Sequence, residues 1–355
     1  MNRNRFIRDA QAGAYIDSFL VSAVGTILVI RFYLHVTGYP QIGGDTLHIA
    51  HMLWGGLLML AAVAILLSFI SRPAKHLAVL VGGIGFGTFI DEVGKFVTQD
   101  NDYFFQPSIA IMYATFVTFY LIGRLIHAWR DYTPTEYLAN ALVEIGELAV
   151  NDLDEDEKER ARVYLSQSDQ NHPLTKPLQN VIADASLVPR SRPGRLRQIR
   201  DWLHRTYLQI ADLPGFATLL ILFFAGHLIV KSSYLFALIF LRDLGPADIL
   251  DSKVVGHLAE RVQNLTYTDL VELMAGFAEA LFLLLGILRI RKSRLQAYRL
   301  FRTSILINIF ITEIFVFAQE QFGALVGFGF NLLVLVALAY LIDREKLRMK
   351  SGASN

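Results

Sequence analysis

The sequence predicts an all-α polytopic membrane protein, a bundle of about eight transmembrane helices. Of its 355 residues, 54% are hydrophobic and only 18% are charged, which is too apolar for an ordinary soluble chain of this length. Windows of about 20 apolar residues predict spans at 15–37, 47–70, 77–98, 108–130, 215–241, 267–289, 298–320 and 324–342. We expect a tight turn around Gly323 to join the last two.

Basic residues predict the orientation of these spans. They gather before the first span, between the second and third, after the fourth, between the sixth and seventh, and after the eighth. The loops 38–46 and 99–107 contain no Lys or Arg. Because cytoplasmic loops carry the excess of Lys and Arg, both termini are expected on the cytoplasmic side.

Net charge and cysteine content exclude several functions. A formal net charge of +1 gives no electrostatic argument for binding nucleic acid. The chain contains no cysteine, which excludes disulfides, thiolate nucleophiles and thiolate metal ligands. Any metal would therefore need His and carboxylate ligands.

The two halves of the chain are similar at an offset of 221 residues. The aligned pairs are His48 with Asp269, His51 with Glu272, Gly55 with Gly276, and Glu92 with Glu313. We interpret residues 1–130 and 214–355 as two four-span repeats, which are parallel because each has an even number of spans. The latter half includes the basic C-terminal tail, and residues 131–213 are interpreted as a soluble, helical, cytoplasmic insert.

Ionisable side chains inside the predicted spans mark a functional site, because such groups are costly in hydrocarbon. In the first repeat they are His48, His51, Asp91 and Glu92, with Arg31 and Lys95 as charge partners. In the second repeat they are Asp269, Glu272 and Glu313, with Lys231 as charge partner. A rise of about 1.5 Å per helical residue places all of them in one layer near the outer surface.

Three interpretations of this layer remain open. His48, His51, Asp91 and Glu92 offer imidazole and carboxylate ligands for a divalent metal, zinc or iron. The same groups suit the handling of protons or other cations without a stable metal, since crowded carboxylates share protons or bind cations. They also suit a buried network of ion pairs that fixes the helices together.

These interpretations lead to three functional hypotheses. The first is proton-linked or divalent-metal-linked transport or permeation through an outward-facing site. The second is a metal-dependent, membrane-embedded hydrolase or transferase acting on a lipid or lipid-linked substrate, with Glu92 as the general base. The third is a non-catalytic scaffold or sensor whose insert binds a cytosolic partner. The segment 194–210, amphipathic and rich in arginine, is expected to lie on anionic lipid.

The motifs around the predicted site resemble those of known membrane proteins. HMLWGG, followed by GIGFGTFIDEVGKF and DNDYFF, is similar to a widespread group of bacterial multi-pass inner-membrane proteins, over residues 45–105. A remoter similarity is to VanZ-like membrane proteins, whose recurrent His and Glu would match His51 and Glu92. The chain departs from that pattern's Glu-x-x-Gln, because Lys95 follows Glu92 at the last position. The resemblance implies a bacterial inner-membrane location and no particular reaction.

Overall fold

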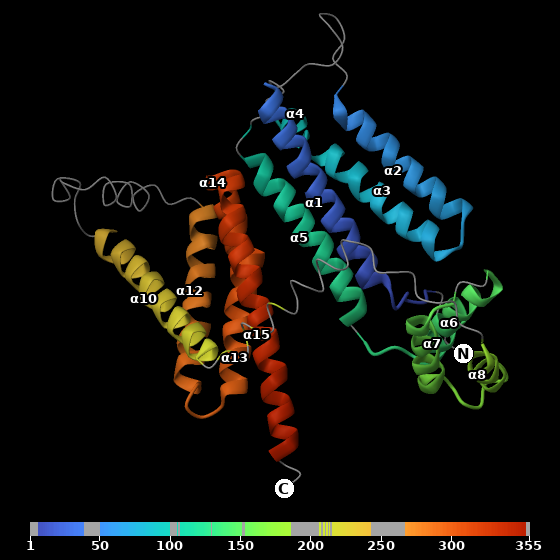
Figure 1. Cartoon of the computed structure of the whole chain (residues 1–355). Helices are drawn as coiled ribbons and strands as arrows, with labels where there is room; N and C mark the ends of the chain where they lie inside the picture. The colour runs from blue at the N-terminus through green and yellow to red at the C-terminus, as the bar shows by residue number, and fades with distance from the viewer. Residues whose placement is uncertain are drawn as a thin grey trace, which may run out of the picture. The chain divides into compact units, whose positions relative to one another are not determined.

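The computed structural model describes residues 6–38, 50–99, 105, 107–128, 130–150, 153–185, 215–242 and 267–352, with isolated residues between 206 and 213. The described residues are helical and contain no β-strand, as the sequence predicts (Figure 1). Contacts divide the chain into two units, Met1–Phe105 with Ala114–Pro193 and Gln106–Tyr113 with Gly194–Asn355. Residues 131–193 of the predicted insert therefore group with the first unit, and residues 194–213 group with the second. Each unit is described by itself.

Five helices of the first unit come from the predicted spans. They are α1 (Ala12–Thr37), α2 (His51–Ser68), α3 (Arg72–Ile90), the short α4 (Val93–Val97), and α5 (Pro107–Ala128), whose first residues group with the second unit. Helix α3 packs against both α1 and α2. Helix α1 ends at Gly38, whose φ of 72° lies in the left-handed region that glycine adopts readily.

Glycines bring α2 and α3 unusually close together. A Cβ atom added at Gly55 would lie 2.6 Å from the carbonyl oxygen of Gly85, and one added at Gly85 would lie 2.7 Å from that of Gly55. Only residues without a side chain fit at such a backbone contact. This contact holds the start of α2 against the end of α3.

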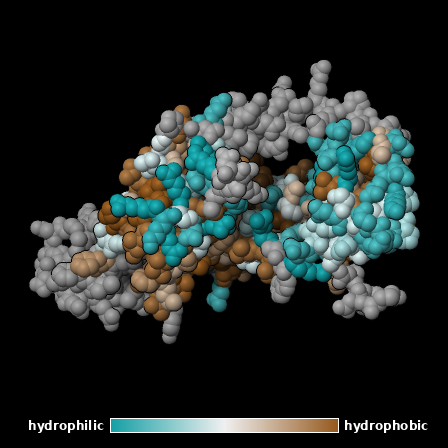
Figure 2. Space-filling view, turned by 90° about the horizontal axis from the view of Figure 1, so that it is seen from below, coloured by the Kyte–Doolittle hydropathy of each residue, from teal (hydrophilic) through white to brown (hydrophobic). Residues whose placement is uncertain are grey.

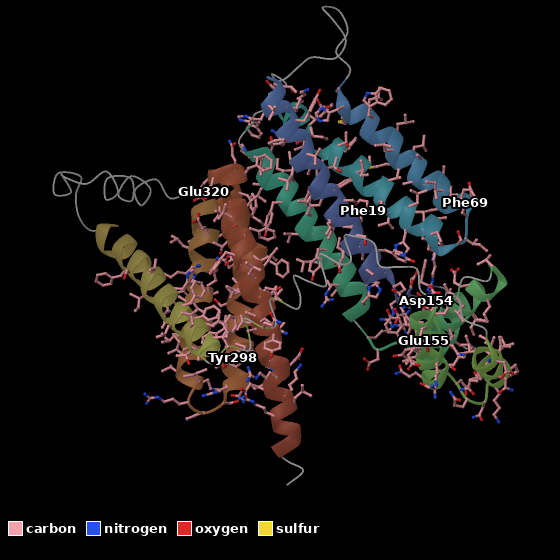
Figure 3. All side chains as sticks on the ribbon, in the orientation of Figure 1. Phe19, Phe69, Asp154, Glu155, Tyr298 and Glu320 are labelled. Atoms are coloured by element: carbon pink, nitrogen blue, oxygen red, sulfur yellow. The ribbon has the colours of Figure 1, made fainter. Side chains whose placement is uncertain are left out.

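A small helical subdomain follows α5. It consists of α6 (Pro134–Ile145), η1 (Gly146–Val150), α7 (Glu155–Gln167) and α8 (Thr175–Asp184). Capping boxes begin α6, at Thr133, and α7, at Asp154, which is labelled in Figure 3. They satisfy backbone N–H groups at the helix starts. Leu138, Ala141, Leu153, Ala161, Leu165 and Ile182 form its buried core. Its surface, at the right of Figure 2, is mainly hydrophilic.

Ion pairs attach this subdomain to the spanning helices of its unit. Arg8 Nε, just before α1, lies 2.9 Å from Glu136 of α6. Arg72, at the start of α3, lies 2.5 Å from Glu144 of α6 and 2.9 Å from Glu157 of α7. The hydrogen bond from Arg8 lowers the pKa of the Glu136 carboxyl far below its usual range. The subdomain is thus joined to the membrane helices through charged groups.

The second unit is also built from helices. They are α10 (Phe216–Arg242), α12 (Tyr267–Arg289), α13 (Arg294–Ile307), the π-helical turn η3 (Asn308–Thr312), α14 (Glu313–Glu320), η4 (Gln321–Gly323) and α15 (Ala324–Gly352). Its core includes Phe224, Leu283, Phe301, Leu338 and Tyr298, which Figure 3 labels on α13. The rings of Phe224 and Phe301 stack with centroids 4.4 Å apart.

The chain turns back between α14 and α15, where the sequence predicts a tight turn. Gln321 has a φ of 53°, a conformation that costs a side-chain-bearing residue energy, whereas Gly323 does not have positive φ. Helices α13 and α15 then pack side by side. The prediction located the turn correctly, but the left-handed residue is the glutamine.

Seven helical stretches among the described residues are long and apolar enough to cross a membrane. The longest, Arg294–Arg348, contains the turn at Gln321 and is therefore folded back on itself. A multi-pass membrane protein is thus the class that both sequence and structure indicate. Most of the predicted basic helix 194–210 lies outside the described residues.

Candidate functional site

The break between α3 and α4 positions two buried carboxylates. Helix α3 ends at Ile90, Asp91 is its C-cap, and Glu92 is the N-cap of α4. Both side chains are 0% exposed. Because two consecutive residues lie in this turn, their side chains point in different directions. Asp91 contacts α1 and the first residue of α2, whereas Glu92 contacts the start of α2 and Lys95.

Asp91 is held by a cation and an imidazole. Arg31 of α1 donates from Nε to Asp91 Oδ1 at 2.6 Å and from a terminal nitrogen to the Asp91 carbonyl at 3.0 Å. His51 Nε2 lies 3.2 Å from the other carboxylate oxygen. An aspartate buried among apolar helices needs such partners, since an unpaired charge there is costly.

Glu92 has a corresponding set of partners. The backbone N–H of Met52, at the N-terminus of α2, donates to Oε2 at 2.8 Å, where the helix dipole also favours negative charge. Lys95 Nζ lies 2.5 Å from Oε1, and His51 Nδ1 lies 3.5 Å from the same oxygen. We call Arg31, His51, Asp91, Glu92 and Lys95 the first polar cluster.

The first polar cluster is balanced in charge and in hydrogen bonds. Arg31 and Lys95 offset the two carboxylates, and each of the four carboxylate oxygens has a nitrogen partner. The sequence predicts that Arg31 and Lys95 are charge partners of this site, and the structure brings both to it. Their arrangement is that of an ion-pair network linking α1, α2 and the α3–α4 turn.

The predicted metal ligands are only partly brought together. His51, Asp91 and Glu92 are adjacent, while His48 lies outside the described residues. No group of three or more His, Asp or Glu side chains suited to a metal ion is found within the described part of the chain. A zinc or iron ion would have to displace Arg31 and Lys95 from the carboxylate oxygens, so these residues fit a metal poorly.

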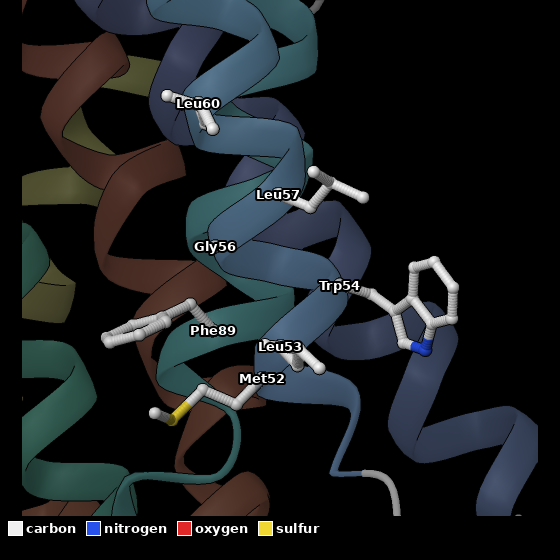
Figure 4. A pocket seen from close by; sticks show the side chains of 7 residues that line it. All are labelled: Met52, Leu53, Trp54, Gly56, Leu57, Leu60 and Phe89. Carbon is white, nitrogen blue, oxygen red and sulfur yellow. The ribbon is translucent and has the colours of Figure 1, made fainter.

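An apolar pocket of about 530 Å³ lies beside the first polar cluster, on the surface of α2. Met52, which follows His51, and Phe89 lie at one edge of it, and Trp54 lies at the opposite edge (Figure 4). Leu53, Gly56, Leu57 and Leu60 complete the lining. The pocket has the character of a site for a hydrocarbon chain.

The second unit contains a buried glutamate with a different environment, Glu279 of α12. Lys231 of α10 forms an ion pair with its Oε2, and Asn308 Nδ2 donates to the same oxygen at 3.2 Å. Thr312, at the end of the π-helical turn, donates to Oε1. Glu279 is 0% exposed. Lys231 is thus a charge partner, as the sequence predicts, but of a residue that was not predicted as part of the site.

Glu313 lies next to this network and lacks a full set of partners. Asn331 of α15 donates to Oε1 at 2.7 Å, and also donates to Asn308 at 2.8 Å. The side chain is 4% exposed, and its second oxygen is buried with no hydrogen-bond partner among the residues that the structure describes. We call Lys231, Glu279, Asn308, Thr312, Glu313 and Asn331 the second polar cluster.

The π-helical turn gives the second polar cluster its geometry. It widens one turn of the helix between α13 and α14, and such turns are frequent at functional sites. The turn carries Asn308 at its start and Thr312 at its end, with Glu313 immediately after. The hydroxyl of Tyr113 donates to the carbonyl of Ile309 within it at 2.6 Å, which satisfies one buried backbone group.

The remaining predicted residues of the second half are less informative. Glu272 is partly exposed on α12, and the Asp269 side chain lies outside the described residues. Glu279 continues the stripe of Asp269, Glu272 and Gly276 at spacings of three and four residues, which the sequence shows, but it was not assigned to the site. Asn308 and Asn331 were not predicted as site residues, because they are uncharged and the sequence shows them only as polar residues in apolar spans.

Comparisons with protein-family models, with curated proteins and with solved structures found no match for this chain.

Proposed function

We propose that the protein is a proton-linked transport or permeation protein in which Glu313 carries the proton. One carboxylate oxygen of Glu313 supports this function, because it is buried and has no hydrogen-bond partner within the described ranges of the chain. An ionised carboxylate with an unsatisfied oxygen is costly in an apolar interior, whereas a protonated one is tolerated. A group that changes between these forms as its surroundings change suits proton transfer.

The neighbours of Glu313 link its charge to that of a second carboxylate. Asn331 donates to Glu313 and to Asn308, and Asn308 donates to Glu279, which pairs with Lys231. The amides do not carry the proton themselves; a change in the charge of Glu313 acts on the Glu279–Lys231 pair through the hydrogen bonds that they share. Ionisable groups in membrane spans commonly mark proton or ion pathways.

We propose a topology of eight membrane crossings, in which the two arms of Arg294–Arg348 cross separately. Both termini and the 131–213 insert then lie on the cytoplasmic side of a bacterial inner membrane. Two parallel four-span repeats then place the two polar clusters in corresponding halves. The first polar cluster, with its charges paired, serves as the fixed element.

Proton flux into proteoliposomes tests this function. A potassium gradient with valinomycin drives protons inward, and an internal pH dye reports the rate. We expect Glu313→Gln to reduce the protein-dependent flux at least about tenfold, because the amide cannot release a proton. Glu320→Gln, the same change at an exposed site on the same helix, is the matched control and should keep the rate.

Two results would contradict the proposal. One is wild-type protein that moves no more protons than empty liposomes under either polarity of the potential. The other is full flux in Glu313→Gln. Divalent cations supplied outside, with a metal-sensitive dye inside, separate metal movement from proton movement in the same vesicles.

A second function is favoured by one observation, the apolar pocket beside the first polar cluster. A membrane-embedded hydrolase or transferase would place the hydrocarbon chain of a lipid there, with the polar part of the substrate near His51. Glu92 would be its general base, but Lys95 and the Met52 N–H already engage that carboxylate. Bound metal in purified protein that is lost in His51→Ala would favour this alternative.

A scaffold or sensor role, with the insert binding a cytosolic partner, is the third function. It would be excluded if cells that carry a deletion of 135–190 had no phenotype.

A further inference from the structure

A second pocket, of about 210 Å³, lies between the start of α1 and the end of α5, and none of its lining residues belongs to either polar cluster. Its walls contain Asp17 of α1 and Tyr120, Arg124 and His127 of α5. The apolar or small residues Ala10, Gly13, Ile16 and Gly123 line the rest. The pocket therefore has an acidic wall and a basic wall, both from the first unit.

The charges of this pocket lie in stretches that are apolar enough to cross a membrane. Asp17 belongs to Ala12–Thr37 and Arg124 to Pro107–His127, and both side chains are exposed. Within the described part of the chain, no ion pair neutralises either of them. Exposed charges on spanning helices are tolerated where they meet lipid headgroups rather than hydrocarbon.

Their position along the helices matches the headgroup layer. Asp17 lies five residues after the start of α1, and Arg124 lies four residues before the end of α5. At about 1.5 Å per residue, both are roughly 6 to 8 Å inside the helix ends. This is about the depth of the polar layer on one side of a bilayer.

The pocket has the size and fixed walls of a binding site for a small headgroup. Its volume of about 210 Å³ equals about seven water-sized volumes, taking about 30 Å³ for each. His127 is held in place by the carbonyl oxygens of Gly123, at 2.8 Å, and Asp9, at 3.2 Å. Gly13 leaves open space, because nothing lies within 4 Å of a Cβ added there.

We infer that this pocket binds an ammonium–phosphate zwitterion of the phosphoethanolamine type, the headgroup of a phospholipid. Arg124 has the planar fork that pairs with phosphate oxygens. Asp17 on the facing wall accepts hydrogen bonds from the primary ammonium. A choline headgroup has no N–H to donate, and a purely anionic headgroup would be repelled by Asp17. The pocket is thus selective for the zwitterion with a primary amine.

Lipid retention by the full-length purified protein tests this inference. The protein is exchanged into mixed micelles with phosphatidylethanolamine, phosphatidylcholine or phosphatidylglycerol, and bound lipid is counted by native mass spectrometry. Wild-type protein should retain phosphatidylethanolamine about three- to tenfold more strongly than the other two, the ratio expected for one solvent-accessible hydrogen bond of ordinary net strength. Water-soluble glycerophosphoethanolamine as competitor distinguishes a lipid ligand from a free phosphate ester.

Substitutions measure separately what the acidic wall, the basic wall and the space between them contribute to lipid retention. Asp17→Asn should abolish the preference for the ethanolamine lipid, and Arg124→Gln should weaken retention of all three lipids. Gly13→Leu fills the pocket without changing charge and should block retention. Gly25→Leu is its matched control, because it lies on the same helix, also has open space and does not line the pocket. Equal retention of the three lipids by wild type, or an ethanolamine preference that survives both Asp17→Asn and Gly13→Leu, would overturn the inference.

Discussion

Glu92 in the first unit and Glu313 in the second are both buried carboxylates that begin a helix after a break in a spanning segment. Both oxygens of Glu92 have nitrogen partners, one of them the ammonium of Lys95. Glu313 has one amide partner and one oxygen without any. The aligned position thus carries a paired charge in one half and an unsatisfied group in the other.

This difference separates two uses of an ionisable residue in a membrane. A carboxylate whose oxygens are all engaged keeps its charge and fixes the helices around it. A half-satisfied carboxylate is stabilised when it takes up a proton. The first polar cluster therefore has the features of an ion-pair network that stabilises the packing of its helices. The second has the features of a site whose carboxylate gains and loses a proton.

The largest expected effect is a difference in the free energy of unfolding between substitutions of the two kinds of carboxylate. Asp91→Asn should destabilise the protein by about 3 to 5 kcal/mol, because it removes the buried negative charge that pairs with Arg31. Glu313→Gln should change stability by less than about 1 kcal/mol, because it replaces a half-satisfied acid with an amide of the same shape. Unfolding titrations in mixed micelles, followed by tryptophan fluorescence, measure both.

A double substitution checks the reason for that cost. Replacing Arg31 and Asp91 together by leucine removes both charges, and the loss of stability should be smaller than for Asp91→Asn alone. If Glu313→Gln proves as destabilising as Asp91→Asn, the contrast between the two glutamate environments would be wrong.

A smaller effect uses pH to compare the two units. Folding lowers the pKa of Glu136 below its ordinary value of 4.5, mainly through the hydrogen bond from Arg8. Its contribution is therefore complete above that ordinary value and is lost as the pH falls from there toward the folded pKa. Hydrogen exchange in α6 should accelerate below about pH 4.5, while α13 in the second unit, whose core is apolar, should respond less.

Variants at neutral pH isolate the contribution of Glu136. Glu136→Gln should already exchange faster at pH 7, by an amount equivalent to about 2 kcal/mol for hydrogen bonds between charged groups, and should lose the acid dependence of this site. Glu159→Gln, an exposed site on α7, should behave as wild type. Identical acid profiles for Glu136→Gln and wild type would contradict the assignment.

The sequence predicted the helical membrane class because composition and span length depend on local residues alone. It also predicted the contacts of Arg31 and Lys231 with buried acids, since an unpaired cation is costly in hydrocarbon. It missed Glu279 as the partner of Lys231. The residue of the first half that aligns with Glu279, at an offset of 221, is Leu58. Because Leu58 is apolar, the repeat predicts Glu272, which aligns with His51, as the acid of this helix.

The π-helical turn was not predictable from the sequence. It depends on how Asn308 and Thr312 bond to Glu279 across the helix interface, which periodicity does not encode. The sequence predicts close helix approach at the glycines of both halves, and the described residues show it in the first half only. Gly55 contacts the backbone of α3, whereas nothing lies within 4 Å of a Cβ added at Gly276.

The two glycines provide the next comparison. Gly55→Ala should destabilise the protein by about 1 to 3 kcal/mol, because the methyl group would meet the backbone of Gly85 and Phe89. Gly276→Ala should stabilise it by up to about 1 kcal/mol, because alanine favours the helix and has space. The same unfolding titration measures both. Equal effects at the two positions would indicate that α2 and α12 have similar surroundings.

The smallest expected effect concerns Thr312, which aligns with Asp91 at the offset of 221 residues. Its hydroxyl donates to Glu279, which also has Lys231 and Asn308 as partners. Thr312→Val keeps the shape, removes one neutral donor and should cost about 1 kcal/mol, well below the cost of Asp91→Asn. Thr303→Val is the control, because the hydroxyl of Thr303 donates to the carbonyl of Arg299 in its own helix and not to a buried acid. A loss of 3 kcal/mol or more, about the lower limit for breaking a buried ion pair, would show that Glu279 depends on Thr312 as Arg31 depends on Asp91.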